Sequence, residues 1–383
     1  MASIKCYKTK NGLKRYELHM YGGINPQTGR PTKIHKMGFK TKKEASLAVS
    51  RLMLEIDNGE LHTQEHILFK NVYDEWYETY INTVRISTYA RTAAMFKNHI
   101  LTEFGKLRID TITTAQVQKA VNKWYKLAPV SGYKRWYHYT VNVFDFALLH
   151  KYMRGDNPAK MVVLPRKRDI SLKDENFYNT EEIKTFFECI DSKKELEKYT
   201  LFRILCFNGI RRGECLALKW SDIDFRNSTL KISKTLTQGL RGETIVQPPK
   251  TKAGNRTISL DTTTLNFLRK WRLQQKKDFI FRGINTLNKD QLIFANQKNG
   301  FKSLNTPAKW QNKIIKDNNL KKITVHGWRH TSCALLFSIG ISLKEVQKRL
   351  GHDDAQTTLN IYAHVTEQQD VETAEKLEHA LDI

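Results

Sequence analysis

Residues 208–214 read Asn-Gly-Ile-Arg-Arg-Gly-Glu, and residues 326–331 read His-Gly-Trp-Arg-His-Thr. The first block follows an apolar run, residues 199–207, which we expect to be buried. Arg211 would then lie at the mouth of a buried segment, with Glu214 three residues later to position its guanidinium. The second block leads into another apolar run, which reads as a helix. Two charged blocks, each joined to a buried segment, predict a polar site in one larger domain.

A small antiparallel sheet is predicted between the two blocks. Residues 230–233, 243–246 and 256–260 each read as a strand. The segment between the last two strands is a turn that carries Lys250 and Lys252. The register of this hairpin is open, so the sequence does not decide which lysine belongs to the site.

The last block is Leu-Gly-His at residues 350–352, followed by Tyr362 ten residues after His352. Each block is weak by itself, since a lone histidine is usually structural and a tyrosine near a C-terminus usually packs. Together, in this order and spacing, the blocks resemble the catalytic domain of the tyrosine recombinase (phage integrase) family. The resemblance covers residues 176–383 and extends upstream, and it points to an integrase of a phage or an integrative conjugative element.

The resemblance implies a role for each matching residue. The implied catalytic set is Arg211, Lys252, His326, Arg329, His352 and Tyr362, with Glu214 as the supporting acid. Tyr362 looks like the nucleophile, so the product would be a 3′-phosphotyrosine and a free 5′ hydroxyl. The linkage keeps the bond energy, so resealing needs no ATP, and the family implies neither a metal nor another cofactor.

These residue types suit cleavage of a phosphodiester. The pentavalent transition state carries extra negative charge, and two guanidiniums can hold its oxygens bidentately, as lysines cannot. A phenol with a reference pKa near ~10 must lose its proton as it attacks, and His326 is the candidate acceptor. The leaving 5′ oxygen must gain a proton, which Lys252 or Lys250 would supply. His352 is expected to hydrogen-bond the phosphate.

The composition favours a nucleic-acid partner. The chain has 383 residues and a formal net charge of +25, an excess that a polyanion would relieve. No run approaches the ~18 apolar residues of a membrane span, and the first ten residues do not resemble a signal peptide. The five cysteines form no Cys-x-x-Cys pair, which favours reduced thiols in a cytoplasmic protein.

The expected fold is α+β with several domains. Residues 1–60 read as a small three-stranded sheet plus a helix, capped by Thr41 with Glu44 three residues later; this resembles an arm-type DNA-binding domain. Residues 65–160 read as an all-helical, SAM-like core-binding domain, and residues 161–175 as a linker. The mainly α catalytic domain, with its small antiparallel sheet, would occupy residues 176–383.

Scattered basic residues are candidates for contact with DNA phosphates, although a solvated charged surface is the commoner fate of such side chains. The candidates are Lys14, Arg15, Arg30, Lys33, Lys36, Arg91 and Lys97. Arg212 lies beside Arg211, but a helix would turn its side chain in another direction.

The function expected from the resemblance is site-specific recombination that integrates and excises a mobile element, such as a viral genome. The implied partners are double-stranded DNA at core and arm attachment sites and three further copies in a DNA-bound homotetramer. A DNA-bending host factor and an excision factor are further expected partners. The alternatives are a resolvase or type IB topoisomerase-like enzyme with the same chemistry, and a non-enzymatic DNA-binding regulator.

Overall fold

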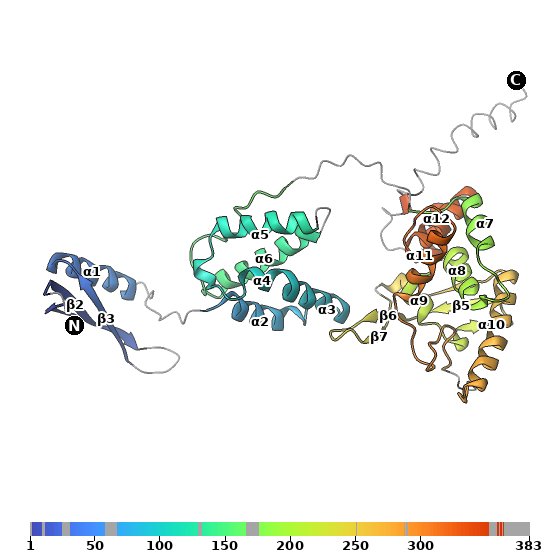
Figure 1. Cartoon of the computed structure of the whole chain (residues 1–383), viewed down its shortest axis with the longest axis horizontal. Helices are drawn as coiled ribbons and strands as arrows, with labels where there is room; N and C mark the ends of the chain where they lie inside the picture. The colour runs from blue at the N-terminus through green and yellow to red at the C-terminus, as the bar shows by residue number, and fades with distance from the viewer. Residues whose placement is uncertain are drawn as a thin grey trace, which may run out of the picture. The chain divides into compact units, whose positions relative to one another are not determined.

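The structure is a computed structural model. It describes residues 2–9, 12–24, 31–57, 67–128, 132–165, 176–249, 251–286, 288, 290–351, 358–359, 361 and 363. The chain divides into two compact units, one of Met1–Thr79 with Phe96–Arg166 and one of Tyr80–Met95 with Lys167–Ile383. Figure 1 labels the main helices and strands. Within the described residues, no helix is long and apolar enough to cross a membrane.

The N-terminal part of the first unit is an antiparallel sheet with one face covered by a helix. Its elements, in the sheet order β1-β2-β3, are β1 (Ala2–Lys8), β2 (Lys14–Ile24) and β3 (Pro31–Phe39), followed by α1 (Lys42–Asp57). Alternate residues of a strand face the same side, so Leu18 and Met20 are both buried, in one cluster with Leu52 of α1. Thr41 Oγ1 accepts a hydrogen bond of 3.1 Å from the backbone N–H of Glu44, which fixes the start of α1 as the sequence predicts.

The rest of the first unit is helical and has an aromatic core. Its elements are α2 (Phe69–Tyr80), η1 (Phe96–Ile100), α4 (Leu101–Phe104), η2 (Ile109–Thr111), α5 (Thr114–Leu127) and α6 (Gly132–Leu149). The buried ring of Phe69 lies 5.5 Å from the ring of Phe104 and 5.5 Å from that of Phe144. This aromatic core therefore connects α2, the first helix of the helical part, with α6, its last helix.

The predicted linker, residues 161–175, is described as far as residue 165. The side-chain amide of Gln118 bonds both the N–H and the carbonyl of Val163, at 2.9 Å each. The Tyr133 hydroxyl donates to the carbonyl of Pro165. The first residues of the predicted linker are therefore hydrogen-bonded to the helical part, and the domain limits themselves stay predictions.

The second unit is mainly helical and packs around one tryptophan. Its helices are α3 (Ile86–Met95), α7 (Thr180–Glu188), α8 (Leu196–Asn208), α9 (Arg212–Leu216), η3 (Trp220–Asp222), η4 (Lys252–Gly254), α10 (Thr262–Phe281), α11 (Thr306–Asp317), α12 (Gly327–Ser338) and α13 (Leu343–Leu350). Trp328 of α12 is fully buried, and its ring lies 4.6 Å from Phe186 and 5.7 Å from Phe202. Its indole N–H donates to Gln311 Oε1 at 2.9 Å, so the polar edge of the ring is also satisfied.

The strands of this unit form two separate groups, where the sequence predicted three strands together. β4 (Ile223–Asp224), β5 (Thr229–Ile232) and β8 (Arg256–Ser259) make one antiparallel sheet. β7 (Thr244–Gln247) pairs with β6 (Thr235–Gln238) in a two-stranded ribbon. The four-residue β6 was missed because a strand this short, with Leu236 as its one buried residue, gives little alternation to recognise.

Candidate active site

The end of α8 brings Arg211 to the surface of the second unit. Gly209 follows the helix with φ +58°, a left-handed conformation that favours glycine. A side chain would also collide there, because a Cβ on Gly209 would lie 2.2 Å from Leu350 Cδ2 and 2.8 Å from Ser332 Oγ. The chain then turns, and Arg211 lies directly before α9 with its side chain 38% exposed.

A buried carboxylate holds Arg211 in place. Glu214 is 1% exposed, and its Oε1 accepts from Arg211 Nη1 at 2.8 Å. Its Oε2 accepts from the backbone N–H of Arg211 at 3.0 Å and from Arg256 Nη2 at 3.1 Å. Burial raises the pKa of Glu214, but the charge of Arg256 and the donors of Arg211 outweigh it and hold the pKa below its usual value. The carboxylate stays ionised and fully engaged, so it is a positioning group and not an available metal ligand.

Arg329 brings the second guanidinium from α12. Its side chain is almost completely buried, and its Nη1 donates to the carbonyl of Gly209 at 2.8 Å. Burial, followed by the nearby charge of Arg211, lowers the pKa of Arg329 to about 9, so the group is still charged at neutral pH. Two guanidiniums that repel each other at the end of α8 form a site that an anion would stabilise.

His326 lies directly before α12 and is neutral at physiological pH. Its ring lies 4.9 Å from that of His330 at an interplanar angle of 90°. The residue is exposed at its surface, but enough protein lies around the ring to disfavour its charged form. This burial, followed by the charges of His330 and Arg329, lowers the pKa of His326 to about 4. A neutral imidazole has the lone pair that accepts a proton from a nucleophile, and a phosphate bound to the two guanidiniums would raise its low pKa.

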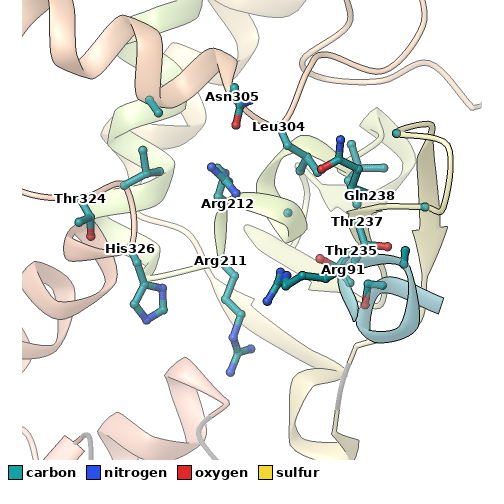
Figure 2. Close-up of a pocket in the computed structure, with 18 of the residues that line it drawn as sticks. Arg91, Arg211, Arg212, Thr235, Thr237, Gln238, Leu304, Asn305, Thr324 and His326 are labelled. Carbon is teal, nitrogen blue, oxygen red and sulfur yellow. The ribbon is translucent and has the colours of Figure 1, made fainter. Parts of the chain in front are cut away.

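Arg211 and His326 line a cleft of about 1020 Å³ in the second unit. Figure 2 shows the side chains of Arg211 and His326 pointing to the same side of the cleft, with Arg91 of α3 on the opposite wall from His326. Arg212 points the other way from Arg211, as the sequence predicts. The cleft therefore gathers positive charge from α3 and from the loop before α9.

Lys252 begins the short helix η4 between β7 and β8, and it is exposed. This turn touches the end of α13, because a Cβ on Gly351 would lie only 2.6 Å from the carbonyl oxygen of Ala253. Arg211 Nη2 also donates to the carbonyl of Gly351, at 3.2 Å. The lysine turn and the residue before His352 thus lie beside the Arg211 guanidinium.

Four predicted residues lie outside the described part of the chain: Arg30, Lys250, His352 and Tyr362. Ile361, next to Tyr362 in sequence, is buried in a cluster with Val346 and Leu350 of α13. Of the predicted DNA contacts, Lys14, Lys33, Lys36, Arg91 and Lys97 are exposed and Arg15 is half-buried. The assignments of all these residues stay predictions.

Arg256 is a residue of the site that the sequence analysis missed. Its side chain is 6% exposed and donates to Glu214, to the carbonyl of Arg349 at 2.9 Å and to that of Gly254 at 3.2 Å. A signal was present: the two-residue period of a strand places Arg256 on the same face as the buried Ile258. An arginine on the inner face of a strand requires a buried acceptor, and Glu214 is that acceptor.

Comparison with known sequences and structures identifies the family. A sequence model described as the phage integrase family matches residues 176–369, just over half of the chain. This chain belongs to the phage integrase family. A model of the N-terminal SAM-like domain of phage integrases matches residues 68–125, and one of an arm DNA-binding domain matches residues 5–56. The predicted family and enzyme class, tyrosine recombinase, are confirmed.

Integrases of other mobile elements align with 81–98% of the chain. The ICEBs1 integrase of Bacillus subtilis is 27% identical over 98% of this chain and 99% of its own length. The Tn1549 transposon integrase, solved in complex with a circular intermediate DNA, superposes with a TM-score of 0.64 at 21% identity, over 81% of this chain and 99% of that one. A lambda integrase tetramer bound to a Holliday junction superposes with a TM-score of 0.56 at 17% identity, over 93% and 94%. The predicted fold class is confirmed.

The low pKa of His326 predicts a pH dependence of stability. A histidine whose pKa falls from about 6.5 to about 4 on folding binds protons more weakly in the folded state. The free energy of unfolding therefore keeps the full contribution of the neutral His326 above pH 6.5. This contribution is lost as the pH falls from 6.5 to 4, because the unfolded chain then binds the proton more strongly. We expect His326→Gln to flatten this part of the stability profile, measured by urea unfolding followed by circular dichroism.

His138→Gln removes an exposed imidazole from α6 and serves as the control. If the wild type and His326→Gln lose stability equally between pH 6.5 and pH 4, the neutral state of His326 is contradicted.

Proposed function

We propose that this chain is an integrase that cuts and rejoins DNA at specific sites through a covalent bond to Tyr362. The observation that carries the proposal is a cleft lined by Arg211 and neutral His326, with the guanidinium of Arg329 close to both, in a chain of the phage integrase family. The scissile phosphate would bind between the two guanidiniums, where it neutralises their mutual repulsion. Each such preorganised donor is typically worth ~10²–10³ in rate.

The proposed cleavage step balances in atoms and protons. The phenol oxygen of Tyr362 forms a bond to phosphorus, and its proton passes to His326. The bond from phosphorus to the 5′ oxygen breaks, and that oxygen takes a proton from Lys252. His352 would hydrogen-bond a phosphate oxygen in the transition state. Reversal of the step, with a 5′ hydroxyl from another strand as the nucleophile, rejoins the DNA without ATP or a metal ion.

The proposed partners follow from charge and from the family. The arm-type sheet and the cleft would bind arm and core sites of double-stranded DNA, which the net charge of +25 favours. Exchange between two duplexes requires four strand cleavages, so four copies would assemble on DNA, as the lambda integrase tetramer does on a Holliday junction. A DNA-bending host factor and an excision factor would decide between integration and excision. The reaction would take place at the nucleoid in the bacterial cytoplasm.

Trapping of the covalent intermediate tests this function. Nicked substrates across an attachment site let the cut fragment diffuse away, so the adduct accumulates. The wild type, without metal ion or ATP, should give a protein–DNA band that survives denaturation in detergent. Tyr362→Phe should give none, while Tyr199→Phe, a partly buried tyrosine of α8, controls for loss of a phenol hydroxyl.

Each other outcome contradicts a specific part of the proposal. A band with Tyr362→Phe would move the nucleophile to another residue. No band with any of the proteins, on DNA that they bind specifically, would favour a non-enzymatic regulator. Relaxation of supercoils without any requirement for an attachment site would favour a type IB topoisomerase. Normal integration after deletion of residues 1–60 would favour a resolvase-like enzyme that needs no arm site.

A sulfur substitution tests whether Lys252 is the general acid. A thiol, with a reference pKa of about 8.5, leaves without a proton, whereas an alcohol does not. We expect Lys252→Ala to slow cleavage of ordinary DNA by about 10²–10⁴-fold. Cleavage should recover to near the wild-type rate on DNA with sulfur at the bridging 5′ position. Lys250→Ala is the matched control, and rescue of Lys250→Ala instead of Lys252→Ala would reverse the assignment.

A further inference from the structure

The N-terminal sheet has one face that α1 leaves uncovered. Figure 1 shows α1 along one face of this sheet. Leu18 and Met20 of β2 pack under α1, so the residues between and beside them face the other way. Glu17 and His19 therefore lie on the uncovered face. His35 of β3 is the direct partner of His19 across the two strands and lies on that face as well.

Glu17 is the one acidic residue in the three strands, which carry six lysines or arginines. Its two carboxylate oxygens both meet imidazole rings. Oε1 lies 3.4 Å from His19 Nε2, and Oε2 lies 3.0 Å from His35 Nε2. The two rings are stacked, with centroids 4.1 Å apart and an interplanar angle of 11°. One carboxylate and two imidazoles thus converge on one point of an open face.

We propose that Glu17, His19 and His35 bind a zinc ion on the uncovered face of the sheet. One ligand atom from each residue lies within 4.8 Å of the others. In a tetrahedral zinc site, with bonds of about 2.0–2.1 Å, ligand atoms lie about 3.3 Å apart, close to the two distances measured here. Small rotations of the exposed His19 and His35 side chains would complete the geometry.

The ligand types select the ion. Imidazole nitrogens suit zinc and its neighbours in the transition series, whereas magnesium and calcium prefer sites made of oxygen ligands. Three protein ligands leave the fourth tetrahedral position open, directed away from the sheet and toward solvent or a bound molecule. The ion would also tie β2 to β3, because its ligands come from both strands.

The consequence for DNA rests on the proposed function. Lys5 and Lys33 flank the cluster, as the cross-strand partners of Glu17 and of Tyr21. A divalent ion there would cancel the one negative charge of the face and add a positive one. If the ion adds one phosphate contact, affinity for arm-site DNA rises about fivefold at 0.15 M salt.

Titration of the full chain with zinc, in competition with a chromophoric chelator and without DNA, tests the site. The wild type should bind one equivalent more than each of Glu17→Gln, His19→Gln and His35→Gln, or bind that equivalent at least about tenfold more tightly. Zinc should also raise the unfolding temperature of the wild-type N-terminal part more than that of these variants. Magnesium at the same concentrations should do neither.

Two control variants retain the three proposed ligands. His138→Gln removes an exposed histidine from α6, and Cys6→Ser removes an exposed thiol from β1. Both should bind zinc as the wild type does. Equal binding by the wild type and the three ligand variants, or loss of the equivalent in Cys6→Ser, would overturn the site. Circular dichroism without zinc would confirm that each variant is folded.

Measurement of arm-DNA affinity with and without zinc tests the effect of zinc on DNA binding separately from zinc binding itself. The wild type should gain about fivefold with zinc, and Glu17→Gln should gain less than about twofold. Zinc binding without any gain in DNA affinity would support the zinc site and contradict its proposed effect on DNA binding. Absence of DNA binding under all conditions would contradict the proposed function, while the titration without DNA would still decide the zinc site.

Discussion

The buried carboxylate of Glu214 is the interaction on which the candidate active site depends. An ionised carboxylate with 1% of its surface exposed is costly unless donors surround it. Arg211 and Arg256 supply those donors from two different elements, and the N–H before α9 supplies another. Arg211, which the proposed chemistry places against the scissile phosphate, is therefore fixed by Glu214. Its side chain lines the cleft.

This network also joins elements that are distant in sequence. Arg256 links β8 to the end of α13 through the carbonyl of Arg349, and Arg211 links the loop before α9 to Gly351. The turn that carries Lys252 packs against Gly351, and the Gly351 carbonyl accepts a hydrogen bond from Arg211. Both segments are therefore connected to Glu214 through Arg211. Arg329 adds α12 through the carbonyl of Gly209. The buried charge of Glu214 thus fixes two guanidiniums, those of Arg211 and Arg256, and the Gly209 carbonyl holds a third, that of Arg329.

Short-range patterns account for what the sequence could predict. The pair Arg211 and Glu214 is three residues apart, and the alternation of Leu18 and Met20 is visible in one strand. Arg256 was missed because its partner Glu214 lies 42 positions away, and one basic residue among 64 gives no signal of burial by its charge alone. The pairing of β7 with β6 was missed because β6, with Leu236 as its one buried residue, shows little alternation. The family resemblance, and not local pattern, supplied the roles of Tyr362 and His352.

The rate of covalent adduct formation in Glu214→Gln tests the account most directly. The substitution keeps the volume and removes the charge that fixes Arg211, so single-turnover adduct formation should slow by about 10²-fold while DNA affinity stays near that of the wild type. Asp222→Asn, which removes the charge of another ion-paired carboxylate of the same unit, should leave the rate nearly unchanged. A folded Glu214→Gln protein that forms the adduct at the wild-type rate would contradict the positioning role of this carboxylate.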